Sequence, residues 1–147
     1  MSTILAIDDD SLFLETVLDL LEGSGFQVNG AGNGLLGLQL AKSQRHDLIL
    51  CDIKMPYLDG YEVLKTLRQD RVMQEIPFIF LAAEQVDSDR NYALSLGAND
   101  FLAKPCTVSQ LLGAIESQLK TGGVKQSVQM PVAIAQALCT TASPPVE

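Results

Sequence analysis

Short apolar runs alternate with longer amphipathic segments over the first 120 residues, and this alternation restricts the folds open to the chain. Most of the runs are continuously apolar rather than alternating, which is typical of strands that are buried on both faces of a sheet. The third run is the clearest, because four apolar residues end abruptly at an aspartate. We expect strands at Thr3–Ile7, Phe26–Ala31, Leu48–Cys51, Phe78–Ala82 and Asp100–Ala103.

The segments between these runs have the periodicity of helices that pack one face against a core. Ser11 is a good N-cap residue for the first helix, and Asp59-Gly60 caps the third. Gly37 lies inside the second helix, where glycine costs about 1 kcal/mol relative to alanine. Helices are expected at Leu12–Glu22, from Asn33 or Gly34 to Lys42, and at Tyr61–Gln69, Ser88–Leu96 and Val108–Leu119.

Five consecutive strand–helix pairs predict right-handed crossovers and a parallel sheet covered by helices on both faces. The predicted fold is α/β, a flavodoxin-like doubly wound (βα)5 domain with five parallel strands in the order 2-1-3-4-5. We assign this domain to residues 1–121. The remaining residues 122–147 carry only Lys125 and Glu147 as charges and have no aromatic residue, so we expect a disordered tail.

Composition excludes several classes of protein. Acids outnumber bases 18 to 10, and a formal charge of −8 argues against direct binding of nucleic acid. No apolar run approaches the ~18 residues of a membrane span, and three aspartates follow the N-terminus too soon for a signal peptide. Three widely spaced cysteines suggest neither disulfides nor zinc, and Cys51 is expected to be a buried thiol. These features predict a cytoplasmic protein.

Acidic residues end two of the predicted strands. Asp8, Asp9 and Asp10 follow the first strand, Asp52 follows the third, and Lys104 follows the fifth. Because ligands of such sheets bind beyond the carboxyl ends of the strands, we expect these side chains to converge in one site. A single aspartate there could be only a helix N-cap, and this alternative applies to Asp10. The whole set, with a lysine opposite, favours a functional site.

Several carboxylates in one crevice require a countercharge. Two carboxylates about 4 Å apart repel by roughly 4 kcal/mol at an effective dielectric constant near 20. Mg²⁺ supplies this charge and prefers oxygen ligands. A carboxylate nucleophile, an oxygen-bound metal and a lysine are together the groups that phosphoryl transfer needs.

At these residues the chain resembles a receiver domain of the bacterial response-regulator family, over residues 1 to about 120. Four stretches carry the resemblance, and their order and spacing make it specific: Ile4–Asp10 (ILAIDDD), Leu48–Gly60 (LILCDIKMPYLDG), Phe78–Ala83 (FIFLAA) and Gly97–Pro105 (GANDFLAKP). The resemblance implies that Asp52 accepts a phosphoryl group from a phosphohistidine on a histidine kinase or phosphotransfer protein. It implies no further enzymatic activity than self-phosphorylation and slow self-dephosphorylation.

The resemblance also implies roles for the other residues of the site. Asp9 and Asp52 would bind Mg²⁺ directly, together with the backbone carbonyl of Lys54, and Asp8 would act mainly through coordinated water. Lys104 would contact a phosphoryl oxygen. Its peptide bond to Pro105 is typically cis in this family.

The sequence departs from the family where the fourth strand ends. The family usually has Thr or Ser at this switch position, and this chain has Ala82, followed by Ala83 as the backbone donor. A hydrogen bond to a charged group contributes roughly 1.5–3 kcal/mol, so its loss would weaken the coupling of phosphorylation to shape. Phe101 occupies the position of the family's switch aromatic, on the face of helix four, strand five and helix five. Downstream partners, or a second copy in a homodimer, would bind this face.

Other interpretations remain open. Ala82 also suits a receiver fold that no longer switches and serves as an interaction scaffold. An aspartyl phosphohydrolase would need an acid two residues after Asp52, where this chain has Lys54. Lys54 and Glu84 either tune the phosphoryl lifetime or form an ordinary surface pair. His46, the only histidine, is expected at the surface.

Overall fold

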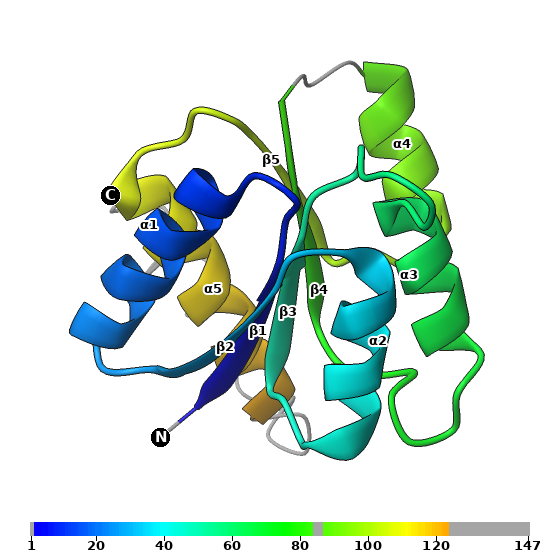
Figure 1. Ribbon diagram of the computed structural model, residues 1–147, viewed down its shortest axis with the longest axis horizontal. Coiled ribbons are helices and arrows are strands. Elements are labelled where there is room, and N and C mark those ends of the chain that lie inside the picture. Colours follow the sequence, from blue (N-terminus) through cyan, green and yellow to red (C-terminus); the bar gives the residue numbers. More distant parts are fainter. Residues whose placement is uncertain (1, 84–86, 124–147) are drawn as a thin grey trace, which may run out of the picture.

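A computed structural model describes residues 2–83 and 87–123. Its centre is one parallel sheet with helices on both faces (Figure 1). The sheet order is β2-β1-β3-β4-β5, which confirms the predicted fold class and strand order. The strands are β1 (Thr3–Ile7), β2 (Gln27–Ala31), β3 (Leu48–Cys51), β4 (Phe78–Ala82) and β5 (Asp100–Ala103).

Helices α1 and α5 cover one face of the sheet, and α2, α3 and α4 cover the other (Figure 1). No helix in the part of the chain that the structure describes is long and apolar enough to cross a bilayer. The helices are α1 (Ser11–Gly23), α2 (Gly34–Ser43), α3 (Gly60–Arg68), α4 (Asp87–Ser95) and α5 (Val108–Gly123).

The last helix is longer than its apolar pattern predicts. It continues past Leu119 to Gly123, so the predicted boundary at residue 121 falls inside α5. The apolar periodicity stops at Leu119, but a helix can continue through glycine at a cost of about 1 kcal/mol per residue. Of the tail predicted to be disordered, residues 122 and 123 belong to α5, and residues 124–147 lie outside the described residues.

Polar side chains cap the first three helices. The N-cap of α1 is Asp10 rather than Ser11, so the expectation for Ser11 is wrong. Asp10 has the extended backbone that an N-cap needs, and its carboxylate accepts a hydrogen bond from the Phe13 N–H at 3.1 Å. Asn33 and Asp59 cap α2 and α3 in the same way, the latter as predicted.

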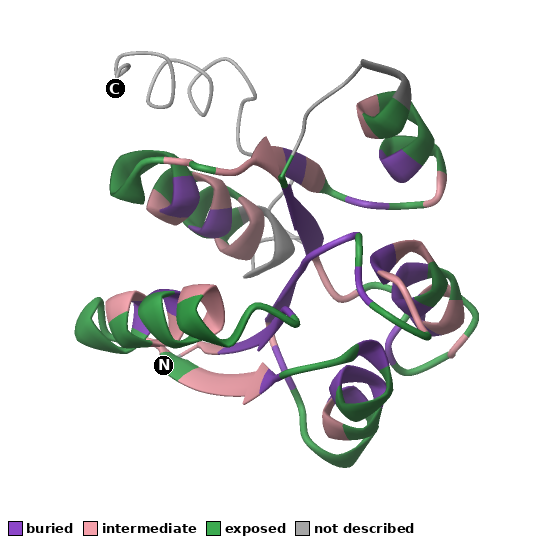
Figure 2. Cartoon of the chain, turned by 45° about the horizontal axis from the view of Figure 1, so that its top comes forward, coloured by how far each residue is buried: buried purple, intermediate pink, exposed green. Residues whose placement is uncertain are grey.

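Two apolar cores lie on opposite sides of the sheet. Successive residues of a strand point to opposite faces, so Ile4 and Ala6 join the core under α1 and α5, whereas Leu5 and Ile7 join the core under α2, α3 and α4. Figure 2 shows the same division, with buried residues along the strands and on the inner faces of the helices. The thiol of Cys51 is buried, as expected.

Gly37 packs directly against β1. A Cβ atom at this position would lie 2.5 Å from Ile7 Cδ1. The helix therefore accepts the unfavourable propensity of glycine because any side chain would overlap with β1.

His46 is buried, contrary to the expectation of a surface residue. Its side chain is 2% exposed, and its Nε2 lies 2.9 Å from Asn29 Nδ2 on β2. Burial lowers the pKa of His46, partly offset by the neighbouring charge of Asp47. The polar sequence around His46 gives no sign of this, because the burial comes from β2, which is distant in the chain.

Candidate functional site

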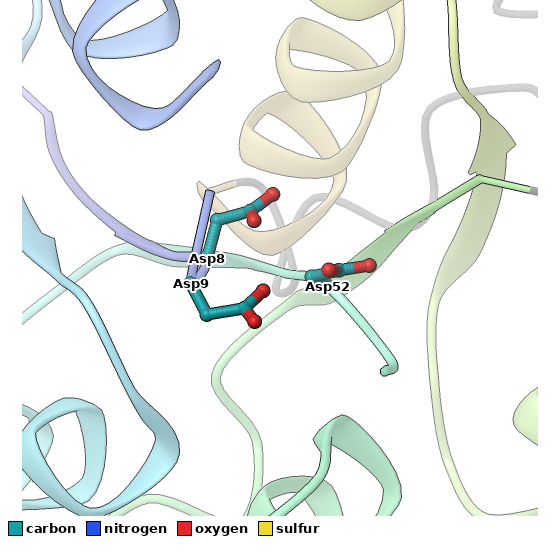
Figure 3. Close-up of side chains that lie close together, drawn as sticks. All are labelled: Asp8, Asp9 and Asp52. Atoms are coloured by element: carbon teal, nitrogen blue, oxygen red, sulfur yellow. The ribbon is translucent and has the colours of Figure 1, made fainter. Parts of the chain in front are cut away.

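Three carboxylates gather at the carboxyl ends of β1 and β3 (Figure 3). Asp8, Asp9 and Asp52 each offer one carboxylate oxygen, and these oxygens all lie within 4.8 Å of one another. The sheet register explains the cluster, because Ile7 is paired with Cys51 and the next residue of each strand is an aspartate. A 2.9 Å hydrogen bond from the Asp52 N–H to the Ile7 carbonyl holds the two ends together.

The three carboxylates differ in their surroundings. Asp8 is 3% exposed and Asp52 is 9% exposed, whereas Asp9 is open to solvent. One oxygen of Asp8 accepts from the Asp10 N–H at 2.9 Å, and one oxygen of Asp52 accepts from the Ile53 N–H at 2.8 Å. The carboxylate of Asp10 serves as the cap of α1 and is not part of the cluster, which confirms the alternative of an N-cap at this residue.

Lys104 brings a positive charge from the end of β5 to the same place. Its Nζ lies 2.7 Å from Asp8 Oδ2 and 3.7 Å from Asp52 Oδ2, and its side chain is 16% exposed. The peptide bond between Lys104 and Pro105 is cis, as the resemblance implies. The structure therefore brings together Asp8, Asp9, Asp52 and Lys104 as the sequence predicts.

One lysine leaves the acidic cluster with excess negative charge. Burial raises the pKa of Asp52 above its usual value of 3.8, and the charge of Asp8 adds to this shift. Lys104 and the Ile53 N–H act in the opposite direction without cancelling it. A hard divalent cation would relieve the repulsion, and a set of carboxylate oxygens is the ligand chemistry that Mg²⁺ prefers.

The proposed switch residues lie at the end of β4 and on β5. Ala82 is buried at the end of β4, and its carbonyl accepts from the Lys104 N–H at 2.6 Å. Ala83 is exposed. Phe101 is fully buried, and its ring packs 6.3 Å from that of Phe80, measured between centroids. The side chain at position 82 is a methyl group, without the hydroxyl that the resemblance leads us to expect.

The loop after β3 carries Lys54, which is exposed. Its hypothesised partner Glu84 lies outside the described residues, so the pairing stays a hypothesis. Gly60 closes this loop, and its N–H donates to the Ile53 carbonyl at 2.8 Å. A Cβ atom at Gly60 would overlap with the backbone oxygen of Asp52, so the glycine permits the close approach of α3 to the site.

Sequence reasoning missed one residue of the site, Phe13. Its ring centroid lies 4.2 Å from Lys104 Nζ. The available signal was an aromatic residue in the first turn of the helix that follows the acidic end of β1, a position that faces the same sheet edge.

Comparison with known proteins gives the same picture. Residues 4–116 match the response regulator receiver domain family, and the chain belongs to this family of two-component signalling domains. The Polar-differentiation response regulator DivK of Brucella anthropi is 33% identical over 80% of this chain and 95% of its own. The Transcriptional regulatory protein CpxR homolog of Haemophilus influenzae is 39% identical over 82% of this chain and 51% of its own.

The chain spans about half the length of the first curated relatives that it matches. Among solved structures, the receiver domain of the sensor histidine kinase PA1611 of Pseudomonas aeruginosa has a TM-score of 0.75 and 29% identity. The match covers 81% of this chain and 98% of that one, which holds a magnesium ion in its active site cleft. The cluster of Asp8, Asp9 and Asp52 here is an acidic group of the kind that could hold a metal ion.

Proposed function

We propose that this receiver domain accepts a phosphoryl group on Asp52 from a phosphohistidine of a sensor histidine kinase or phosphotransfer protein, with Mg²⁺, and signals through altered protein–protein binding. The observation that carries the proposal is the position of Lys104 Nζ, between the carboxylates of Asp8 and Asp52. A purely structural salt bridge would need one partner, whereas this lysine faces both the nucleophile and the acidic cluster.

The two oxygens of Asp52 have different surroundings. Oδ1 accepts the Ile53 N–H, and Oδ2 faces Lys104. Oδ2 is therefore the oxygen that attacks phosphorus, while the Ile53 N–H holds the carboxylate in place. The new O–P bond forms as the N–P bond of the phosphohistidine breaks, and its electron pair returns to the imidazole. The Lys104 ammonium then neutralises charge on the phosphoryl oxygens.

Asp9, Asp52 and the backbone carbonyl of Lys54 would hold the metal, and Asp8 would act mainly through coordinated water. The bound ion would neutralise the equatorial oxygens of the transferred group. Asp8 also fixes Lys104, because its Oδ2 accepts from the ammonium at 2.7 Å. The chain's own chemistry would be limited to self-phosphorylation and slow self-dephosphorylation.

The proposal includes a cytoplasmic location and no direct contact of this domain with nucleic acid. The formal charge of −8 supports the last point. The face formed by α4, β5 and α5 would bind the downstream protein, or a second copy in a homodimer.

The proposal is tested with the full chain, Mg²⁺ and a small phosphodonor, followed by measurement of the intact mass. We expect a gain of one phosphoryl group that is lost in Asp52→Asn and on removal of Mg²⁺. Phosphotransfer profiling against the histidine kinases of the host would then identify the donor. A chain that gains no phosphoryl group on Asp52 from any donor would overturn the proposal.

A second function, a receiver fold that binds partners without switching, is favoured by the buried methyl group of Ala82. The test compares the parent with Ala82→Thr by amide hydrogen exchange, with and without a phosphate mimic bound. Under the phosphoacceptor proposal the parent responds at β4, α4 and β5, and the threonine strengthens the response. A parent that binds the mimic without change in these elements supports the scaffold.

A further inference from the structure

We propose that Phe13 is a positioning residue that holds the ammonium of Lys104 over the acidic cluster through a cation–π contact. The inference deepens the proposed function and rests on it for its kinetic consequence. Phe13 itself would touch neither the metal nor the phosphoryl group.

The geometry around Lys104 Nζ shows three neighbours. Asp8 Oδ2 lies at 2.7 Å, Asp52 Oδ2 lies at 3.7 Å, and the centroid of the Phe13 ring lies at 4.2 Å. A cation within ~6 Å of an aromatic centroid is attracted by the negative face of the ring, more strongly where water is excluded. The lysine side chain is 16% exposed, so the ring replaces part of the water that an ammonium ion would otherwise keep.

The first turn of α1 fixes the ring in this position. The Phe13 N–H donates to Asp10 Oδ1 at 3.1 Å, and the Asp10 N–H donates to Asp8 Oδ1 at 2.9 Å. Asp8 in turn accepts from Lys104, which lies over the ring. These four residues form a closed circuit of contacts, which we call the lysine circuit. A helix cap, a carboxylate and an aromatic face therefore place the ammonium jointly.

An aromatic ring has an advantage over a fourth carboxylate. The cluster already has more acids than bases, and another acid would add to the repulsion that raises the pKa of Asp52. The ring attracts the ammonium without adding net charge. It also has no ligand atom for a hard cation, so Phe13 would not itself bind a metal that the carboxylates hold.

A purely structural role makes different predictions. Phe13 also packs against the core under α1 and α5, and any apolar side chain of similar size would preserve that packing. Phe13→Leu keeps an apolar side chain and removes the π face, whereas Phe13→Tyr keeps the π face. Leu14→Val, which alters a partly buried neighbour in the same core, is the matched packing control.

The first measurement uses nuclear magnetic resonance of the metal-free full chain. The ring current of Phe13 shifts the Lys104 ε-methylene protons upfield. We expect the shift to be lost in Phe13→Leu and kept in Phe13→Tyr and Leu14→Val. An unchanged shift in Phe13→Leu would overturn the proposal, whether or not Asp52 is ever phosphorylated.

The second measurement is a double-mutant cycle with Lys104→Met, on the rate of Asp52 phosphorylation by a small phosphodonor at saturating Mg²⁺. We expect Phe13→Leu to slow the parent about three- to tenfold, the range that a cation–π contact of ordinary strength gives. It should have no further effect in the Lys104→Met background, and Mg²⁺ affinity by calorimetry should stay within about twofold.

Equal effects of Phe13→Leu in both backgrounds would show that Phe13 only packs. The same cycle on the unfolding midpoint of the metal-free protein provides a readout if Lys104→Met is too slow to measure. Failure of the parent to be phosphorylated would instead overturn the proposed function. The ring-current and unfolding results would in that case still decide the placement of Lys104.

Discussion

The Asp52 carboxylate lies where its charged form is costly in the metal-free protein. It is largely buried beside Asp8, and both effects raise its pKa. Because the folded protein retains this proton to higher pH than the unfolded chain, the group's contribution favours folding below pH 3.8. That contribution is lost as the pH rises through the folded-state pKa. At neutral pH the ionised nucleophile therefore lowers stability.

We expect Asp52→Asn to raise the free energy of unfolding by about 1 kcal/mol at neutral pH without metal, because it removes one like charge from the cluster. Chemical denaturation measures the change. Asp19→Asn, at an exposed position on α1, is the control and should have an effect within about 0.5 kcal/mol of zero. Equal effects of the two substitutions would contradict the argument. The gain should shrink at about pH 4, where Asp52 is increasingly protonated.

The sequence predicts the charged residues of the site but not the groups that position them. Asp8, Asp9, Asp52 and Lys104 are predictable because each follows a strand, and parallel strands end at one edge. The position of Phe13 in the first turn of α1 gave a signal, but its contact with Lys104 is not predictable, because it joins residues from opposite ends of the domain. The prediction that His46 lies at the surface is wrong for the same reason, since its partner Asn29 lies on β2, which is distant in the chain.

At the level of single elements, the cap of α1 belongs to Asp10. The predicted elements are placed correctly because apolar periodicity is a local property, whereas the choice of cap depends on backbone angles. Ser11 and Asp10 are both good capping residues by type, and only the extended conformation of Asp10 distinguishes them. The predicted start of a helix is therefore uncertain by one residue where two neighbouring residues have similar capping propensities.

Asp10→Ala should destabilise the protein by about 1 kcal/mol, because the Phe13 N–H loses its acceptor at the first turn. Ser11→Ala should change stability by less than about 0.5 kcal/mol, since Ser11 lies inside the helix. Thermal and chemical unfolding of both variants give the comparison. A larger loss for Ser11→Ala would show that the cap is assigned to the wrong residue.

Gly60 sets the distance between α3 and the site. An alanine Cβ there would overlap with the Asp52 carbonyl and lie 2.9 Å from Phe80 Cε1. We expect Gly60→Ala to cost about 2 kcal/mol or more, because the backbone around the nucleophile must shift.

Gly113→Ala provides the matched control, because this glycine is exposed on α5 with open space around its Cα. It should stabilise the protein by about 0.5–1 kcal/mol through helix propensity. Urea denaturation of both variants measures the two effects. If both substitutions changed the free energy of unfolding in the same direction, the close approach of α3 at Gly60 would not explain the need for glycine there.

At the scale of the domain, the two cores and the site that the described residues form lie within residues 4–119. The family match ends at residue 116, within α5. We expect a chain that ends at Gly123 to keep the unfolding free energy of the full chain within about 0.5 kcal/mol, and to be phosphorylated at the same rate. A lower stability or a slower rate would show that residues 124–147 contribute to the folded domain or its site.

The close packing of Gly37 on Ile7 has a consequence for how accurately the two acidic residues that follow β1 are placed. A strand that is apolar on both sides has no polar edge to penalise a slip by one residue, so hydrophobicity alone specifies its alignment poorly. The space left by the missing side chain of Gly37 is filled by Ile7, the last residue before Asp8 and Asp9. Gly37 thereby fixes the alignment of β1 along the helix. The positions of Asp8 and Asp9 at the end of β1 therefore depend on a residue that has no side chain.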